Sequence, residues 1–307
     1  MCTVSVIIPN YNHAAYLAQR ITSVLNQSLP PSEIIILDDF STDNSRAVIN
    51  EFANQDARIL TTFNDRNSGS PFKQWAKGLS MAREKYIWIA ESDDYADPAF
   101  LEKAVSMLDK EPTAGMVYSQ SWLVDDKGVI IDSCRNLYKT LAPDIVHSGK
   151  EILEQHMAGT NIIPNASAVV FRKQVADQIE NAYQDFRLSG DWWFWCQLLS
   201  VSDLFYIDEE LNYFRSHTQK VTVASHKDQT AILESLRVLQ LLYQKRLISS
   251  KVFHLKSKNV ARQLADRQKD RIRALRAKNL FPVLAYAWRN NTVFLWQYVR
   301  VFLRGLR

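Results

Sequence analysis

Three carboxylate side chains lie within four residues of one another in the first third of the chain: Glu91, Asp93 and Asp94. Carboxylates this close repel one another unless a cation compensates their charge. Hard divalent ions such as Mg²⁺ and Mn²⁺ prefer these oxygen ligands, usually in combination with substrate phosphates. The cluster therefore predicts a Mg²⁺ or Mn²⁺ site, and the alternative is a solvated acidic turn ahead of a helix that follows Pro98.

A second acidic pair, Asp38 and Asp39, comes before a Phe40-Ser41-Thr42-Asp43 run. A carboxylate at such a position can accept a hydrogen bond from a ribose hydroxyl or from a nucleobase N–H. A helix cap by Ser41 or Asp43 would not require the adjacent pair. The pair therefore favours ligand binding.

Tyr11 lies between Asn10 and Asn12 and has a ring that can stack on a nucleobase. A lone tyrosine is more often a partly buried core residue, so both interpretations stay open. Neither a Walker A sequence nor a G-x-G-x-x-G sequence occurs in the chain. We therefore expect a metal ion, and not a glycine-rich loop, to hold any phosphate groups.

Asp191 follows Gly190 and begins a strongly aromatic segment that runs to Trp195. A carboxylate in an aromatic, partly dry wall is a candidate general base. An acidic residue in the first turn of a helix is also favoured by the helix dipole alone. His217 is a lone histidine, which is more often structural than catalytic.

The elements that must position these residues alternate between strand and helix patterns in the first hundred residues. This alternation predicts βαβ units and a mostly parallel sheet. Right-handed crossovers then bring the loops after Ile8, Leu37 and Ala90 to one edge, where ligands bind in open α/β sheets. The predicted strands are 4–8, 33–37, 58–63 and 86–90, and the predicted helices are 14–27, 41–54 and 72–83.

The middle of the chain is less regular, and the end is helical. The predicted elements are a helix at 98–109, a hairpin at 116–124 and 129–132, a strand at 168–171, an aromatic helix at 191–199, closing strands at 204–207 and 211–215, and helices after residue 225.

The composition is that of a folded protein in a reducing compartment. The chain has 307 residues, 47% of them hydrophobic and 23% charged, which excludes disordered, collagen-like and coiled-coil proteins. Cys2, Cys134 and Cys196 form neither a C-x-x-C pair nor a disulfide framework. The N-terminus lacks a secretory signal pattern, and no apolar run approaches the roughly 20 residues of a spanning helix. We expect a cytoplasmic protein.

The last part of the chain is strongly basic, with 18 Lys and Arg against 4 Asp and Glu in residues 225–307. An apolar helical stripe (Leu295, Val299, Phe302, Leu306) lies opposite Arg300, Arg304 and Arg307, with Trp288 and Trp296 close by. Such helices bind anionic membrane surfaces, here the inner face of the cell membrane. Packing on the catalytic domain or on a second subunit is the alternative. Nucleic-acid binding is not expected, because no reading module accompanies the charge.

Three motifs in this order resemble the large inverting glycosyltransferase family 2: residues 4–12, residues 34–45 with the Asp38-Asp39 pair, and residues 91–94. The resemblance covers about residues 3–217. It implies the α/β GT-A fold, a Rossmann-like, mostly parallel sheet flanked by helices. Residues 1–97 would be the nucleotide-sugar-binding half, 98–224 the acceptor-binding half, and 225–307 a helical basic extension.

The resemblance also implies roles for individual residues. Pro9 and Tyr11 would line the nucleobase pocket, and Asp39 would accept a hydrogen bond from the base with Asp38 nearby. Lys73 stands where the family usually has an arginine-asparagine pair and would contact the donor diphosphate. The remaining assignments are Asp93 and Asp94 as donor and metal ligands, with Glu91 replacing the first Asp of the family's D-x-D motif, Asp191 as general base, and His217 as a further metal or phosphate contact.

The activity implied is transfer of a sugar from a nucleoside diphosphate to a hydroxyl group, with inversion and with Mn²⁺ or Mg²⁺. A UDP-sugar is the favoured donor, with GDP- and dTDP-sugars as alternatives, and the acceptor is a cell-surface glycan that is lipid-linked or protein-linked. A sugar nucleotidyltransferase is the alternative enzyme, but residues 9–12 lack its glycine-rich signature with a basic residue. The other alternative is a catalytically idle scaffold of the same fold.

Overall fold

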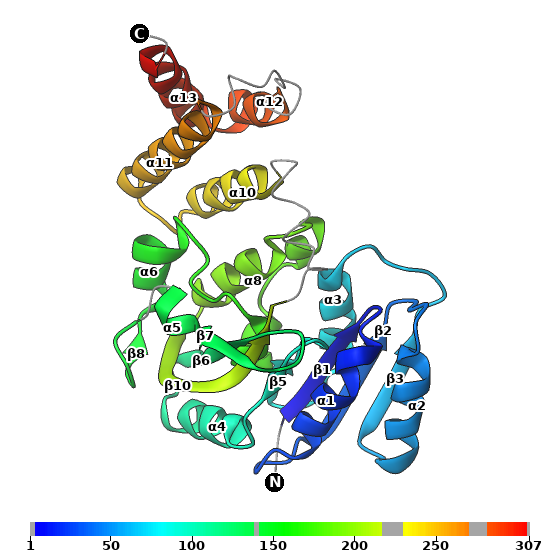
Figure 1. The fold of residues 1–307 in the computed structure, drawn as a ribbon. Coiled ribbons are helices and arrows are strands. Elements are labelled where there is room, and N and C mark those ends of the chain that lie inside the picture. The colour runs from blue at the N-terminus through cyan, green and yellow to red at the C-terminus, as the bar shows by residue number, and fades with distance from the viewer. Residues whose placement is uncertain (1–3, 138–140, 217–229, 270–280, 306–307) are drawn as a thin grey trace. The chain divides into compact units, whose positions relative to one another are not determined.

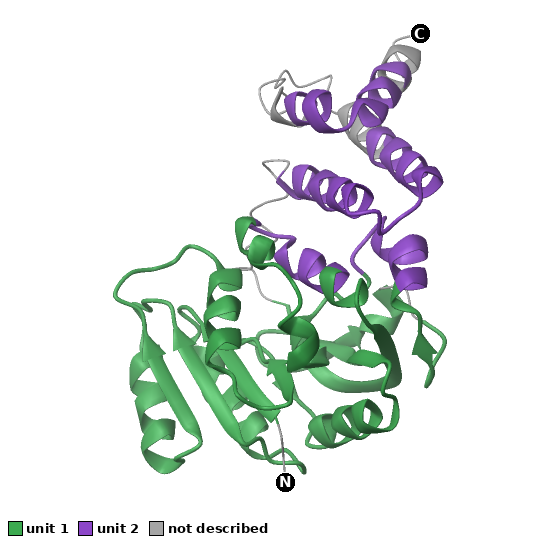
Figure 2. Ribbon diagram, turned by 180° about the vertical axis from the view of Figure 1, so that it is seen from behind, with its two compact units in different colours: residues 1–149, 162–185, 197–217 green, residues 150–161, 186–196, 218–307 purple. Residues whose placement is uncertain are grey.

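The computed structural model describes residues 4–137, 141–216, 230–269 and 281–305 (Figure 1). The chain forms two compact units (Figure 2). Unit 1 comprises residues 1–149, 162–185 and 197–217, and unit 2 comprises residues 150–161, 186–196 and 218–307. Because the units interleave along the chain, no single boundary in the sequence separates them.

The first half of unit 1 is a parallel sheet with the strand order β3-β2-β1-β4, as the alternating pattern predicted. Nearly every residue of β1, β2 and β4 is buried, because helices cover both faces of the sheet. Right-handed crossovers place α1 and α2 on one face and α3 on the other (Figure 1). The elements are β1 (Val4–Asn10), α1 (Ala14–Leu25), β2 (Glu33–Asp38), α2 (Ser45–Gln55), β3 (Ile59–Phe63), α3 (Pro71–Met81) and β4 (Tyr86–Ile89).

The sheet continues through β4 to β9, β6, β10 and β5, with β7 beside β6 and β8 beside β10. Strand β9 is antiparallel to both of its neighbours, whereas β6 and β10 are parallel to each other. The two closing strands predicted separately form one strand, β10, with register shifts after Ile207 and Glu210. The elements are β5 (Tyr95–Ala96), α4 (Phe100–Lys110), β6 (Ala114–Val124), β7 (Ile130–Ser133), β8 (Val146–His147), β9 (Val169–Arg172) and β10 (Asp203–Arg215).

The helix predicted from residue 41 begins at Ser45 instead. Asp43 accepts hydrogen bonds from the backbone N–H of Ser45 (2.9 Å) and of Ala14 (2.9 Å). Ser41 is used differently, since its hydroxyl accepts from the side chain of Asn10 and from the backbone of Asn12. Asp43 thus keeps a local bond to the first residue of α2, whereas the first loop uses the hydroxyl of Ser41.

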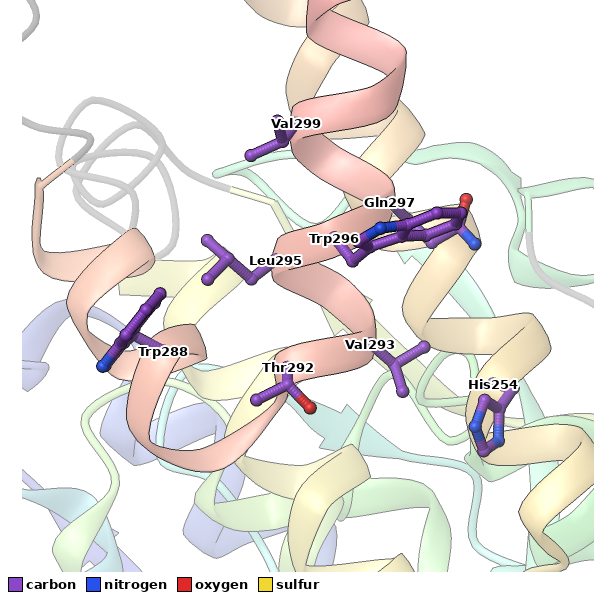
Figure 3. Close-up of a pocket in the computed structure, with 8 residues that line it drawn as sticks. All are labelled: His254, Trp288, Thr292, Val293, Leu295, Trp296, Gln297 and Val299. Atoms are coloured by element: carbon purple, nitrogen blue, oxygen red, sulfur yellow. The ribbon is translucent and has the colours of Figure 1, made fainter.

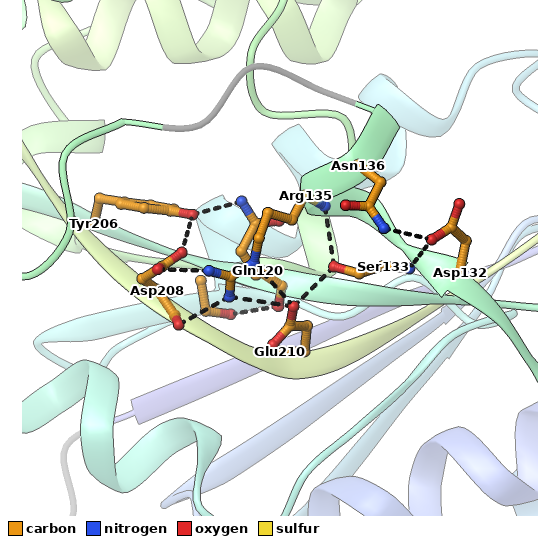
Figure 4. Close-up of polar contacts among 9 residues, drawn as sticks. Gln120, Asp132, Ser133, Arg135, Asn136, Tyr206, Asp208 and Glu210 are labelled. Carbon is orange, nitrogen blue, oxygen red and sulfur yellow. Dashed lines mark hydrogen bonds and ion pairs between the residues drawn. The ribbon is translucent and has the colours of Figure 1, made fainter.

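A polar network fastens the β6–β7 hairpin and the short helix α5 (Cys134–Leu137) to β10 (Figure 4). Arg135 pairs with Asp208 (2.6 Å) and with Glu210 (3.2 Å). The hydroxyl of Ser133 donates to Glu210 at 2.8 Å. The other short elements, which the sequence did not suggest, are α6 (Gly149–Ile152), η1 (Leu153–Met157), η2 (Ala166–Ala168), α7 (Lys173–Ala176) and η3 (Asn181–Asp185).

Unit 2 contains a cluster of helices with its own apolar core, and its C-terminal helices confirm the helical pattern predicted after residue 225. No helix in the described part of the chain has both the length and the hydropathy needed to cross a bilayer. The core residues are Leu236, Ala261, Ala287, Phe294 and Tyr298. The helices are α8 (Gly190–Leu199, whose last residues are assigned to unit 1), α10 (Thr230–Gln244), α11 (Ser250–Lys269), α12 (Phe281–Asn290) and α13 (Thr292–Gly305).

Candidate active site

The loops after β1 and β2 are bonded to each other at the carboxyl edge of the parallel strands. The amide nitrogen of Asn10 donates to Asp38 Oδ1 (3.0 Å) and to Ser41 Oγ (3.2 Å). Asn12 has a positive φ of 56°, a conformation that asparagine tolerates better than most residues. Its side-chain oxygen accepts from the backbone N–H of Thr42 at 2.7 Å. These bonds fix the two loops that sequence reasoning singled out.

The same edge includes the acidic turn of residues 91–94. His13 Nδ1 lies 2.8 Å from the hydroxyl oxygen of Ser92, which links the first loop to this turn. Two adjacent residues of α3 make the other link. Gln74 donates to Asp39 Oδ1 (2.9 Å), and the indole N–H of Trp75 donates to Glu91 Oε1 (2.8 Å).

Asp39 is almost fully buried, and its carboxylate is surrounded by donors. Oδ1 accepts from the side chains of Asn64 (2.7 Å) and Gln74 (2.9 Å). Ser68 donates with its backbone N–H, 2.9 Å from Oδ1, and with its hydroxyl, 2.7 Å from Oδ2. The carboxylate therefore holds the segment 64–74 against the sheet edge. Lys73 in that segment is exposed and donates to the carbonyl oxygen of Ser68 at 3.0 Å.

The carboxylates of the acidic turn have three different environments. Asp94 is buried and accepts from the backbone N–H of Arg215 (2.9 Å) and the hydroxyl of Ser167 (2.8 Å). Burial raises the pKa of Glu91 to about 8, and the neighbouring charge of Asp93 adds to this effect. Asp93 itself is partly exposed. Glu91 is also partly exposed, so the turn presents two partly exposed carboxylates, of which Glu91 is bonded to Trp75.

Two buried arginines support the backbone of the turn. Arg20 Nε donates to the carbonyl oxygen of Glu91 at 2.8 Å, and Arg215 Nε donates to that of Asp93 at 2.7 Å. Burial lowers the pKa of Arg20 to about 10, while the nearby acidic residues oppose this shift. The two guanidinium groups offset the repulsion within the turn and hold its backbone. Sequence reasoning missed Arg20, although a charge within the apolar stripe of a helix is a visible signal.

The described residues contain no group of three or more His, Cys, Asp or Glu side chains arranged to hold a metal ion. Both oxygens of Asp94 accept hydrogen bonds, and Glu91 is turned toward Trp75. Mg²⁺ commonly binds through one or two carboxylates plus substrate phosphates. Asp93 with a bound diphosphate is a donor set that fits this chemistry. His217 lies outside the described residues, so its predicted role stays a prediction.

The two residues assigned to the nucleobase pocket differ in exposure. Pro9 is buried within β1, and Tyr11, which follows the strand, is 46% exposed. Tyr11 is therefore not a core residue, and its ring is accessible for stacking. Phe40 on the neighbouring loop is 43% exposed and has a φ of 66°.

Asp191 lies in unit 2, in the first turn of α8, while the acidic turn lies in unit 1. Asn161 donates to its Oδ2 at 3.1 Å. Burial raises the pKa of Asp191 to about 7, and the negative charge of Glu234 raises it further. A carboxylate with this pKa is half-ionised near neutral pH, as a general base requires.

Glu234 of α10 fixes the segment that leads to Asp191, and sequence reasoning missed it. Its buried carboxylate accepts from three consecutive backbone N–H groups, those of Arg187 (2.7 Å), Leu188 (2.9 Å) and Ser189 (2.8 Å). A carboxylate with this many backbone donors is strongly held. An acidic residue within an apolar stretch of an otherwise basic region was the available signal.

The sheet order, with its single antiparallel strand between β4 and β6, and the acidic turn after β4 define the GT-A fold. The crystal structure of S. aureus TarS residues 1–349 has this fold and matches with a TM-score of 0.60 at 17% identity, covering 99% of this chain and 92% of that one. The predicted fold class is confirmed. At this identity the likeness establishes the fold alone.

Sequence comparison identifies the family. Residues 5–157 match the model described as Glycosyl transferase family 2, and the chain belongs to this family. An uncharacterized glycosyltransferase of Haemophilus influenzae is 39% identical over 108 residues, 35% of this chain and 43% of that protein. The putative teichuronic acid biosynthesis glycosyltransferase TuaG of Bacillus subtilis is 34% identical over 123 residues, 40% of this chain and 48% of that protein. The matched stretch thus spans about half of each of these relatives.

Proposed function

We propose that this protein transfers a sugar from a nucleoside-diphosphate donor to an acceptor hydroxyl, with inversion at the anomeric carbon. The observation that carries the proposal is Asp191, a partly buried carboxylate in the first turn of α8 that accepts a hydrogen bond from Asn161 and whose pKa is raised to about 7. A hydroxyl is weakly nucleophilic at neutral pH, so a base of this strength is what the reaction needs. Family membership and the polar sheet edge support the same assignment.

In the proposed reaction the acceptor oxygen attacks the anomeric carbon from the face opposite the leaving group. Its proton passes to Asp191, the new C–O bond forms, and the bond to the nucleoside diphosphate breaks. Positive charge develops on the sugar ring, as in glycoside hydrolysis. A single displacement inverts the configuration, and Asn161, which donates to Asp191 Oδ2, orients the base.

On the donor side, we assign the nucleobase to Tyr11 and Pro9 and the diphosphate to Lys73 and Asp93. Tyr11 is accessible for stacking, and Lys73 supplies a positive charge at the same edge. Asp39 is assigned to the base N–H, which requires that one of its present partners, such as Ser68, give way. Asp38 supports the pocket through Asn10.

Mn²⁺ or Mg²⁺ would be held by Asp93 together with the donor diphosphate, and Asp94 and His217 are its further proposed ligands. The ion would stabilise the negative charge of the departing diphosphate as a Lewis acid. The buried arginines Arg20 and Arg215 hold the backbone of the turn so that Asp93 keeps its place.

A UDP-sugar donor and a cell-surface glycan acceptor are the substrates we propose. TarS has been crystallised with UDP and with UDP-GlcNAc. The matched relatives TarS and TuaG carry names that refer to poly(ribitol-phosphate) and to teichuronic acid biosynthesis. The acceptor is therefore proposed to be a hydroxyl of such a polymer or of its lipid-linked or protein-linked precursor.

A donor panel tests the proposal. UDP-, GDP- and dTDP-sugars are added with and without Mn²⁺, and binding is read from the thermal shift and turnover from donor hydrolysis. We expect stabilisation and slow hydrolysis with UDP-sugars, dependent on Mn²⁺, and a product of inverted configuration by NMR. Binding without turnover under any condition would point to an idle scaffold, and absence of binding would refute the proposal.

A further inference from the structure

Helices α12 and α13 expose large apolar side chains on the surface of unit 2. Trp288 is 72% exposed, Trp296 is 60% exposed and Val299 is 44% exposed. Both tryptophans line one pocket of about 910 Å³, together with His254 of α11 (Figure 3). Isolated exposed apolar residues are common, but a contiguous group of this kind marks an interaction surface.

The exposed group is separate from the side of α13 that packs in the core. Phe294 and Tyr298 are buried against α10 and α11, and Leu295 is partly buried against the same cluster. Trp296 and Val299, three residues apart on α13, both stay exposed, Trp296 on the side of His254 and Val299 on the side of Leu295 (Figure 3). Internal packing of unit 2 therefore accounts for Phe294 and Tyr298 and leaves Trp296 and Val299 without a role in the core.

Positive charges surround this apolar group. The guanidinium of Arg300 lies 5.2 Å from the ring centre of Trp296, and Arg289 is exposed beside Trp288. On α11, Lys251 and Lys258 share the side of His254, because they lie three residues before it and four after it. Residues 245–262 and 284–300 contain eight Lys and Arg and neither Asp nor Glu. The surface is therefore aromatic and cationic, with no acidic residue in these segments.

We propose that this surface, defined by Trp288, Trp296, Val299, Arg289 and Arg300, docks on an anionic lipid bilayer. Tryptophan rings partition to the interface between headgroups and acyl chains, and arginines pair with anionic headgroups. Each basic residue near such a membrane adds to the attraction. The proposal does not depend on the proposed catalytic function.

Charge favours a lipid surface over the same face of a second copy. Two copies meeting through this surface would bring Arg289 and Arg300 of each close to those of the other, and like charges in contact oppose association. An anionic bilayer instead neutralises the same groups.

Sedimentation with vesicles tests the proposal on the full chain. The vesicles are phosphatidylcholine alone or phosphatidylcholine with phosphatidylglycerol. We expect the protein to pellet only with the anionic vesicles and less so at high salt, because exposed charges are screened. Replacing both tryptophans (Trp288→Ala with Trp296→Ala) is expected to weaken binding roughly tenfold per ring, as partial loss of a buried aromatic side chain predicts. The pair Arg289→Glu and Arg300→Glu should abolish binding.

The matched controls are Ile131→Ala, an exposed apolar residue of unit 1, and Lys110→Glu, an exposed cation of unit 1. Both are expected to bind as the unchanged protein does, and thermal melting confirms that each variant is folded. The proposal is overturned if the unchanged protein does not bind anionic vesicles, or if the tryptophan variants bind equally well. It is also overturned if the unchanged protein forms an oligomer by light scattering, binds no vesicles, and becomes monomeric when the tryptophans are replaced.

Discussion

At the scale of single residues, desolvation of its carboxylate is what suits Asp191 to the proposed role of general base. A carboxylate in water would be fully ionised at neutral pH and a weak base, whereas the interior of unit 2 raises the pKa of Asp191 to about 7. Glu91 has a pKa raised to about 8 for the same main reason, and its Oε1 accepts a hydrogen bond from the indole N–H of Trp75. Asp93 stays partly exposed. The carboxylates of Asp191, Glu91 and Asp93 thus differ in their surroundings, although the side chains are chemically alike.

Asp191→Asn is expected to lower kcat by about 10²–10⁴, the usual effect of removing a general base, while the donor dissociation constant stays nearly unchanged. In the unchanged enzyme kcat/KM should fall below pH 7, because protonated Asp191 cannot accept the proton. Steady-state kinetics measures kcat and kcat/KM, and donor titration by calorimetry measures the donor dissociation constant. Asp177→Asn, an exposed carboxylate of unit 1, is the control. A parallel loss of donor affinity would make Asp191 a binding residue.

The same substitution should stabilise the protein at alkaline pH. The pKa of Asp191 is about 7 in the folded protein and about 3.8 in the unfolded chain. The folded state therefore favours the protonated form, and its stability falls as pH rises from about 4 to about 7 and is then constant. Asp191→Asn removes this penalty. We expect its gain in unfolding free energy to be larger at pH 8 than at pH 5 by about 2.6 kcal/mol. Urea denaturation at both pH values measures it, and an equal gain at both would contradict the assigned pKa.

At the scale of elements, helices that are distant in the sequence hold the segments that carry the candidate site residues. Helix α3 links the β2 loop to the acidic turn through Gln74 and Trp75. Helix α10 holds the entry to α8 through Glu234, whose carboxylate accepts three backbone N–H groups. Removing such an acceptor leaves buried donors unsatisfied, which typically costs about 1–3 kcal/mol each.

Glu234→Gln is expected to reduce kcat by about tenfold, because a neutral amide with one acceptor oxygen holds residues 187–189 less firmly. The acid limb of the kcat/KM profile should also move to lower pH, since loss of the negative charge makes Asp191 easier to ionise. Steady-state kinetics over a range of pH values gives kcat and the profile of kcat/KM, and so measures both effects. Glu154→Gln, an acidic residue of unit 2 that bonds Ser249, is the control. An unshifted limb would show that Glu234 acts only on folding.

At the scale of the whole molecule, the candidate site residues belong to two units that interleave in sequence. Unit 1 contains the sheet edge with Asp39 and Asp93, and unit 2 contains Asp191 together with the basic helices. Phe294 of α13 and Leu236 of α10 belong to the same buried apolar cluster, and α10 carries Glu234. The basic helices are therefore part of the structure that positions the candidate base, beyond any docking role.

Phe294→Ala is expected to destabilise unit 2 by about 3–5 kcal/mol, as loss of a buried aromatic side chain does. Because that core supports α10, transfer activity should fall while donor binding by unit 1 is kept. Thermal unfolding followed by tryptophan fluorescence, together with donor titration, distinguishes the two units. Trp296→Ala, two residues away and exposed, should change neither the stability of unit 2 nor donor binding. Loss of donor binding in Phe294→Ala would show that the two units unfold as one.

Local pattern was sufficient to predict the parallel half of the fold. The short periodic segments around β1, β2 and β4 are set by their own apolar residues, and parallel strands necessarily bring residues 10–12, 38–39 and 91–94 to one edge. Tertiary structure alone decided which partners each polar group found. The bonds of Asp39 to Ser68, of Arg215 to the acidic turn and of Glu234 to residues 187–189 join segments far apart in sequence, and no local spacing encodes them. Tertiary structure also decided which apolar side of α13 is buried. Several sides of that helix are apolar, and the shared core of unit 2 contains Phe294 and Tyr298.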